Sequence, residues 1–347
     1  MHPSLKPLAD SFVGYLAERW EMPVVLKTIE QIPGGASRET YRVRVEAGGE
    51  IQGLIFRRDP VSSLIDTERA LEYQTYVAVW GTEVPVPEPL ILEEDTRHLE
   101  RPFSVMREIP GCETGIPLLS TPPYDGLRET IGGNKWTLLG KLAAMDVTQL
   151  GVTDFMEVPE HPAARELDYW AGVIDGDALH PQPVAQATIR WLRRNLPPPG
   201  PKLCLVHGDY RSGNFLYDTD GDIRGVLDWE MAHIGDPLED LAWSLDPVWA
   251  WPERELAGAL LPRSQAIEIW QQASGLPVDR EVLRWWQIFA SLKALAIWIS
   301  STEDFINGES KEPILGMAGW VLTDRQNRIL VDRLQPGSAL LYAEAVV

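Results

Sequence analysis

A short stretch in the second half of the chain concentrates residues that could do chemistry. It contains His207, Asp209, Asn214, Asp228 and Glu230, separated by glycines and other turn-forming residues. Turn formers between short apolar runs favour loops joined by tight hairpins, which would bring these side chains together. A carboxamide and a carboxylate from neighbouring loops make a set of hard oxygen donors. Such a set suits Mg²⁺, which commonly bridges protein carboxylates to the phosphates of a substrate.

On this interpretation Asn214 and Asp228 are the candidate Mg²⁺ ligands. Asp209 is then left to orient or deprotonate an attacking hydroxyl, and no role is assigned to Glu230. Asp and Asn are also common turn formers and caps, so a purely structural role is the alternative. A metallohydrolase could use His207, Asp209 and Asp228. That alternative is poor, because the other five histidines, at positions 2, 98, 161, 180 and 233, form no metal-ligand spacing.

Two ordered motifs in this stretch resemble a known family. H-G-D-x-x-x-x-N at 207–214, followed by D-W-E at 228–230, is similar to the catalytic and metal-binding loops of the aminoglycoside phosphotransferase / choline kinase-like family. This family is a branch of the protein-kinase-like superfamily. The run G-D-P-L-E-D-L-A-W at 235–243 also resembles the family. The resemblance implies a catalytic base at Asp209, Mg²⁺ ligands at Asn214 and Asp228, a loop-organising role for His207, and a supporting helix residue at Asp240.

The N-terminal half offers candidates for binding the nucleotide. Gly34, Gly35 and Ser37 lie between two predicted strands, where glycines let backbone N–H groups approach phosphates closely. In kinases a basic residue on the third strand binds the phosphates and pairs with a glutamate on the next helix. The matching positions here are Arg57 and Glu72.

Arginine at position 57 departs from the lysine that most of the superfamily carries. Its planar fork can chelate a phosphate with two N–H groups, but it sits differently from an ammonium. Glu68 competes with Glu72 as its partner, and Arg58 competes with Arg57 as the phosphate ligand. The segment S-V-M-R-E-I-P-G at 104–111 looks like the hinge of the family, where backbone groups near Arg107 and Ile109 would bond to adenine.

The elements around these motifs predict an α+β fold. A helix is expected at 7–20, then strands and one helix up to about residue 107. The strands are expected at 24–32, 40–45, 52–58, 90–92 and 103–107, and the helix at 66–79. Helices dominate afterwards, at 127–150, 164–173, 183–195, 238–245, 264–273, 282–302 and 313–334. The resemblance implies a bilobal protein-kinase-like fold, with a small antiparallel-sheet N-lobe at 1–108 that binds the nucleotide and a larger, mainly helical C-lobe at 109–347 for catalysis and acceptor binding.

Charge and composition restrict the partners. The 347 residues include 31 basic and 51 acidic side chains, a net charge of −20. Nucleic acid and anionic membrane surfaces need clustered Lys and Arg, so neither is an expected partner. The N-terminus shows no secretory pattern, the longest apolar stretches are too short to span a bilayer, and the two cysteines make no disulfide framework. We therefore expect a cytoplasmic protein.

Together these features predict an ATP- and Mg²⁺-dependent O-phosphotransferase acting on a hydroxyl of a small molecule. The −20 charge favours an aminoglycoside-like acceptor, while a hydroxyacyl-CoA or a choline-like amino alcohol stays open. A nucleotide-binding pseudokinase is a further alternative, because Arg57 replaces the usual lysine. A protein kinase is disfavoured, since no G-x-G-x-x-G loop and no A-P-E segment is found.

Overall fold

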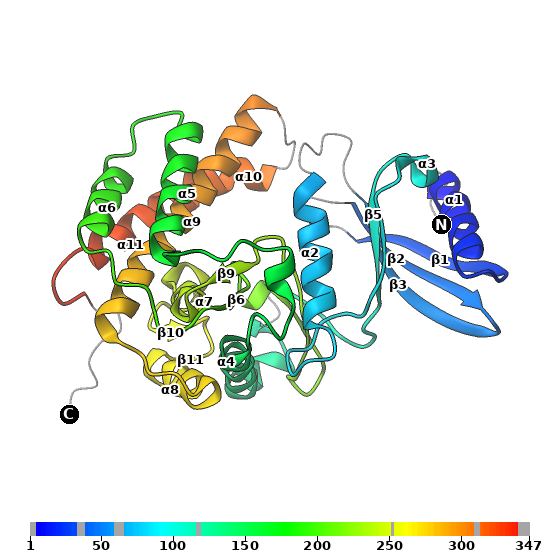
Figure 1. Ribbon diagram of the computed structural model, residues 1–347, viewed down its shortest axis with the longest axis horizontal. Coiled ribbons are helices and arrows are strands. Elements are labelled where there is room, and N and C mark those ends of the chain that lie inside the picture. The colour runs from blue at the N-terminus through cyan, green and yellow to red at the C-terminus, as the bar shows by residue number, and fades with distance from the viewer. Residues whose placement is uncertain are drawn as a thin grey trace. The chain divides into compact units, whose positions relative to one another are not determined.

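The computed structural model describes residues 5–32, 39–58, 66–115, 119–250, 253–308 and 313–338. The chain forms two compact units (Figure 1). Unit 1 comprises Met1–Cys112 with Arg224–Leu227, and unit 2 comprises Glu113–Ile223 with Asp228–Val347. A five-stranded antiparallel sheet in unit 1 and mostly helices in unit 2 confirm the α+β class expected from the sequence.

Unit 1 is built on one sheet with the strand order β1-β2-β3-β5-β4, in which every neighbouring pair is antiparallel. Its strands are β1 (Val24–Ile32), β2 (Glu39–Ala47), β3 (Glu50–Arg58), β4 (Pro89–Glu93) and β5 (Phe103–Arg107). Its helices are α1 (Lys6–Arg19), α2 (Asp66–Val79) and the short α3 (Thr96–Leu99). All five strands and the two longer helices coincide with predicted elements, whereas α3 was not predicted.

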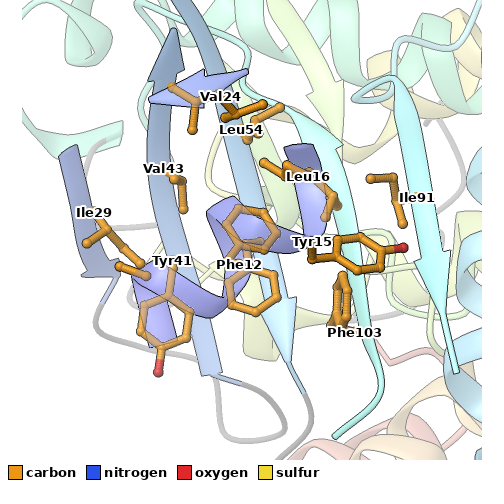
Figure 2. Packing of buried hydrophobic residues seen from close by; sticks show 14 of the residues in the cluster. Phe12, Tyr15, Leu16, Val24, Ile29, Tyr41, Val43, Leu54, Ile91 and Phe103 are labelled. Carbon is orange, nitrogen blue, oxygen red and sulfur yellow. The ribbon is translucent and has the colours of Figure 1, made fainter. Parts of the chain in front are cut away.

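One face of this sheet is covered by α1. Alternation along β2 turns Tyr41 and Val43 inward, where they meet Phe12 and Leu16 of α1 (Figure 2). The Phe12 ring stacks on Phe56 of β3 at 4.4 Å between centroids. Since successive strand residues point to opposite faces, Arg57 belongs to the face that α1 leaves uncovered. The core of unit 1 therefore fixes β3 and with it the direction of a candidate phosphate ligand.

Unit 2 is organised around the long helix α9 (Arg280–Asn307), which contacts α5, α6, α7, α10 and α11. Its other long helices are α4 (Arg128–Ala144), α5 (Pro162–Asp177), α6 (Pro183–Arg194), α7 (Pro237–Ser244), α8 (Arg263–Ser274) and α11 (Thr323–Arg333). By length and composition alone α9 could cross a membrane, yet most of its apolar part is buried inside unit 2. It is the central core helix of this unit.

Short strands frame the loops that carry the sequence motifs. β6 (Cys204–Val206) pairs with β9 (His233–Gly235), and β7 (Phe215–Tyr217) pairs with β8 (Ile223–Val226). A third pair joins β10 (Leu256–Ala257) and β11 (Leu261–Pro262). The motif residues at 207–214 follow β6, and those at 228–230 lie between β8 and β9. Each loop is therefore connected at one end to a strand of the β6–β9 pair.

The predicted helix 313–334 is wrong as a single element. It divides into α10 (Pro313–Met317), one π-helical turn (Ala318–Leu322) and α11. Gly316 and Gly319 pack so closely on α9 that a Cβ at Gly319 would overlap the Thr302 hydroxyl. Such a close approach favours an inserted turn over a regular helix.

Candidate active site

The loop after β6 has a backbone that only glycine accommodates easily. Gly208 has φ +84°, and a Cβ there would overlap the carbonyl oxygen of Met231 in the neighbouring loop. The H-G-D sequence therefore allows a close approach of the two motif-bearing loops. The ring of His207 lies against Trp229 of the second loop, with 4.5 Å between centroids.

His207 and Asp240 fix the backbone of the loop at 207–214, the candidate catalytic loop. The carboxylate of Asp240, on α7, accepts the His207 amide at 2.6 Å and the Gly208 amide at 3.0 Å. The Nδ1 atom of fully buried His207 accepts the amide of Asp209 at 3.1 Å. These contacts are the ones that loop-organising and helix-borne supporting residues need. Burial raises the pKa of Asp240, and the electrostatic interaction with His207 and the bond from the His207 amide partly offset that effect.

The Asp209 carboxylate is surrounded by hydrogen-bond donors. Trp243 Nε1 donates to Oδ1 at 3.0 Å, and Asn214 Nδ2 donates to Oδ2 at 2.8 Å. Arg211 Nε shares its N–H between both oxygens, at 3.0 and 2.9 Å. Three side chains thus hold the carboxylate in one orientation. Because Arg211 bonds to both oxygens of Asp209, it can keep one bond when a substrate hydroxyl bonds to the other oxygen. Asn214 and Trp243 can then stay in place.

The contacts of Asn214 determine which way its amide points. Its Nδ2 donates both to the backbone oxygen and to Oδ2 of Asp209, at 3.0 and 2.8 Å. The reversed amide would place an oxygen against two acceptors, which excludes it. The side-chain oxygen of Asn214 therefore faces away from Asp209 and is the atom that can coordinate a cation.

Asp228 sits at a sharp backbone position at the start of the second loop. It has φ +69°, a region that Asp tolerates better than most residues. Trp229, the next residue, is fully buried against His207, while Asp228 and Glu230 are partly exposed. Hard oxygen donors from two touching loops fit Mg²⁺, the metal expected from the sequence.

A buried lysine lies next to the catalytic loop. Lys135 of α4 is fully buried, with Nζ 3.4 Å from the Ser212 hydroxyl and 5.8 Å from the Phe215 ring centroid. Burial, aided by Arg211, lowers the pKa of Lys135 to about 7. No motif or spacing in the sequence singled out this lysine.

In unit 1, the predicted pair of Arg57 and Glu72 is present. Arg57 Nη1 lies 2.5 Å from Glu72 Oε1, and the glutamate side chain is only 4% exposed. Arg58, the competing phosphate ligand, is bonded to Glu39 at 2.7 Å. The side chain of Glu68, the competing partner of Arg57, lies outside the described residues.

The remaining nucleotide candidates are only partly described. Gly34, Gly35 and Ser37 lie outside the described residues. The amide of Arg107 donates to the Glu88 carbonyl at 2.9 Å, so a contact from Arg107 to adenine cannot use this N–H. Ile109 donates no hydrogen bond to any residue that the structure describes, and its amide is the better candidate.

Sequence reasoning missed two groups that touch Asp209. Arg211 stands inside the H-G-D-Y-R motif and Trp243 closes the 235–243 motif, so their places in the motifs were the available signal. A third missed residue is Lys293, a lone charge in the apolar run of α9. A single lysine among buried apolar residues requires a partner, and this requirement could have revealed it.

Comparisons with known proteins agree with the geometry of this site. The sequence model described as "APH: Phosphotransferase enzyme family" matches residues 28–286. The chain is 32% identical to viomycin phosphotransferase of Streptomyces vinaceus over 148 residues, which are 41% of this chain and 49% of that protein. It is 27% identical over 238 residues to acyl-CoA dehydrogenase family member 11 of Gallus gallus, which covers 67% of this chain and 29% of that protein. The chain thus spans less than a third of the length of these dehydrogenase-named relatives.

Solved structures share the protein-kinase-like fold at low sequence identity, which confirms the fold expected from the sequence. A Ralstonia eutropha protein provisionally assigned as an aminoglycoside phosphotransferase superposes with a TM-score of 0.74 at 19% identity, covering 94% of this chain and 97% of that one. Aminoglycoside phosphotransferase APH(4)-Ia, solved with ADP and hygromycin B, gives 0.60 at 16% identity, covering 94% of this chain and 100% of the other.

Proposed function

The chain belongs to the phosphotransferase enzyme family, and on that premise we propose that it is a small-molecule kinase, which transfers the γ-phosphoryl group of ATP to an alcohol. The observation that carries the proposal is the Asp209 carboxylate, held by Asn214, Trp243 and Arg211 beside the oriented oxygen of Asn214. A fixed carboxylate next to a hard cation site is what phosphoryl transfer to a hydroxyl needs.

In this proposal Asp209 receives the proton of the acceptor. The hydroxyl oxygen forms a bond to the γ-phosphorus, the bond from that phosphorus to the bridging oxygen of ADP breaks, and the hydroxyl proton passes to an Asp209 oxygen. Positioning and electrostatic stabilisation supply most of the acceleration, because the transition state is loose and highly charged. The donors on Asp209 serve the positioning.

Asn214 and Asp228 are the residues that would hold Mg²⁺. Bound there, the ion would neutralise charge on the β- and γ-phosphates. The outward amide oxygen of Asn214 and the loop contact between Trp229 and His207 support this assignment. Glu230, partly exposed beside Asp228, keeps no assigned role.

For the nucleotide we propose that Arg57 binds the triphosphate and that Glu72 holds its guanidinium. Arg58 is the weaker candidate, because Glu39 already takes its guanidinium. Gly34, Gly35 and Ser37 are proposed to add backbone and hydroxyl donors. The Ile109 amide, with the backbone near Arg107, is proposed to bond to adenine.

The acceptor is proposed to be an aminoglycoside-like alcohol. The name of viomycin phosphotransferase and the hygromycin B complex of APH(4)-Ia support this class. A hydroxyacyl thioester of coenzyme A is the second candidate, because six relatives of 26–28% identity carry the name acyl-CoA dehydrogenase family member.

The test is the Asp209→Asn variant, assayed by ADP release with hygromycin B, choline and a hydroxyacyl-CoA. Turnover should fall by about 10²–10⁴-fold while ATP binding persists, because the amide keeps the shape but cannot take the proton. Near-normal turnover in Asp209→Asn would refute the base assignment. ATP binding by the wild-type protein without ADP release on any acceptor would favour a nucleotide-binding pseudokinase instead.

A further inference from the structure

Four charged side chains meet in the interior of unit 2, away from the ligands assigned above. Glu239 of α7 and Lys293 of α9 are each 2% exposed, with 3.3 Å between Oε1 and Nζ. His233 of β9 lies 3.1 Å from the other Glu239 oxygen and 3.6 Å from the carboxylate of Glu166 on α5. We call these four residues the buried quartet.

The quartet is balanced in charge. Burial alone would lower the pKa of His233, but the carboxylates of Glu239 and Glu166 outweigh it and raise that pKa to about 9. Burial would raise the pKa of Glu239, yet His233 and Lys293 lower it to about 2. The quartet therefore sets two basic side chains, His233 and Lys293, against two acidic ones, Glu166 and Glu239.

Glu166, His233 and Glu239 also lie close enough together to hold a metal ion. The ammonium of Lys293 and the imidazolium of His233 already supply the positive charge that such an ion would bring. Another cation beside Lys293 would be repelled, so the interpretation as an ion-pair cluster is the stronger one.

One end of the quartet is bonded to the catalytic loop. Lys293 Nζ donates to the carbonyl of Gly208, the residue before Asp209, at 2.9 Å. The same ammonium lies 5.1 Å from the ring centroid of Trp243, whose Nε1 donates to Asp209. Lys293 thus contacts two groups that position Asp209. One is the carbonyl of Gly208, and the other is the indole of Trp243, which donates to the Asp209 carboxylate.

The other end is bonded to the loop that bears Asp228. His233 Nδ1 donates to the Met231 carbonyl at 3.0 Å, and this carbonyl is the group packed against Gly208. Asp240, next in sequence to Glu239, accepts the amides of His207 and Gly208. Charged groups therefore hold both the N–H and the C=O of Gly208, and both depend on the same turn of α7.

We propose that Lys293 is a positioning residue, which through Gly208 and Trp243 sets the place of Asp209, with Glu239 and His233 fixing its ammonium and the Asp228 loop. This inference rests on the proposed role of Asp209 as the base. The buried quartet then contributes to turnover as well as to the stability of unit 2.

The test separates positioning from charge balance with two variants. Lys293→Met alone leaves Glu239 short of one cation in the interior, a strongly destabilising change. The double variant Glu239→Gln/Lys293→Met removes one charge of each sign and keeps a side-chain oxygen on α7 for His233. The matched control is Asp246→Asn/Arg333→Met, because this pair is also fully buried, at 2.8 Å, and the side-chain bonds described for it go to residues outside both motif loops, namely Val248, Gln287, Ser291 and Gln326.

If Lys293 positions Asp209, kcat of the double variant stays about 10²-fold low while KM for ATP changes little and the melting temperature recovers relative to Lys293→Met. Hydrogen exchange of the peptide containing residues 207–209 should speed up in the double variant and not in the control. The control should lose melting temperature but keep kcat in assays run well below its transition.

Recovery of kcat together with melting temperature in the double variant would overturn the proposal, and so would unchanged exchange of residues 207–209. If the wild-type protein itself releases no ADP with hygromycin B, choline or a hydroxyacyl-CoA, the proposed function fails. In that case the exchange measurement alone decides whether Lys293 orders the loop.

Discussion

The guanidinium of Arg57 lies 2.5 Å from the carboxylate of Glu72, joining the third strand of the sheet in unit 1 to helix α2. Lysine is the usual residue at this position in the superfamily, and arginine here keeps the ion pair with the helix. The glutamate is almost fully buried, so the pair contributes to the fold as well as to the proposed phosphate contact.

Replacing Arg57 should separate these two contributions. Arg57→Ala is expected to weaken binding of ATP much more than binding of adenosine, because only ATP carries the phosphates that the guanidinium would hold. It should also cost about 3 kcal/mol of stability, since the buried carboxylate of Glu72 loses the guanidinium of Arg57. Calorimetric titrations with both ligands measure the first effect, and Arg57→Lys should keep part of both.

The double variant Arg57→Ala/Glu72→Gln controls for the buried negative charge of Glu72. It should regain stability without regaining ATP affinity. Equal losses for ATP and adenosine in this double variant would show that Arg57 serves only the fold.

Replacing Asp228 should affect the metal. Asp228→Ala is expected to remove most of the tightening that Mg²⁺ gives to ATP binding, a loss of at least ~10-fold, because the variant lacks the only carboxylate assigned to the ion. Titrations of ATP with Mg²⁺ and with EDTA measure the difference. Asp220→Ala, an exposed carboxylate in the turn between β7 and β8, is the control and should behave as wild type. Unchanged Mg²⁺ dependence in Asp228→Ala would disprove the assignment.

Stability should fall at alkaline pH because of His233. Burial and the facing ammonium of Lys293 lower the pKa of His233, but the facing carboxylates of Glu239 and Glu166 outweigh them and raise it from 6.5 to about 9. A raised pKa contributes stability that is complete below 6.5 and is lost as pH rises through 9, up to ~3 kcal/mol in all. Melting temperatures of wild type and His233→Gln should therefore converge between pH 6.5 and 9.5. The exposed His180→Gln is the control, and parallel curves for wild type and His233→Gln would contradict the linkage.

Salt should reveal the charge of the acceptor. For a polycation such as an aminoglycoside, raising ionic strength from 0.01 to 0.5 M should increase KM, since screening shortens the reach of the −20 charge. Asp209 is paired with Arg211, so this attraction must come from other acidic residues. A KM that is constant or falls with salt would count against a cationic acceptor and would favour the hydroxyacyl thioester.

The sequence predicted the elements of unit 1 closely because strand alternation and glycine turns are local signals. β1, β5 and α2 begin and end at the expected residues. Prediction was weaker where tertiary packing decides, as in the π-helical turn where Gly319 meets α9. The helix expected at 127–150 ends at Ala144, because Asp146 caps the following turn through the amides of residues 148 and 149.

In the candidate site too, residues close in sequence could be predicted and residues brought together by tertiary packing could not. Asp209, Asn214 and Asp228 could be predicted as site residues because the motifs keep them close in sequence. The buried quartet could not be, because Glu166, His233 and Lys293 come from distant segments and no spacing rule links them. His233 was even set aside as lacking ligand spacing, although it faces two carboxylates in space.

The bond from Lys293 to Gly208 affects when the chain can become active during its synthesis. Ribosomes release the chain from its N-terminus, so every residue assigned to phosphate chemistry emerges before α9, which begins at Arg280. Until α9 has emerged and packed, the Gly208 carbonyl lacks its ammonium and Glu239 lacks one of its two cations. We expect nascent chains that end before residue 280 to be catalytically silent. Activity is thus coupled to the synthesis of α9, well after the motif loops have left the ribosome.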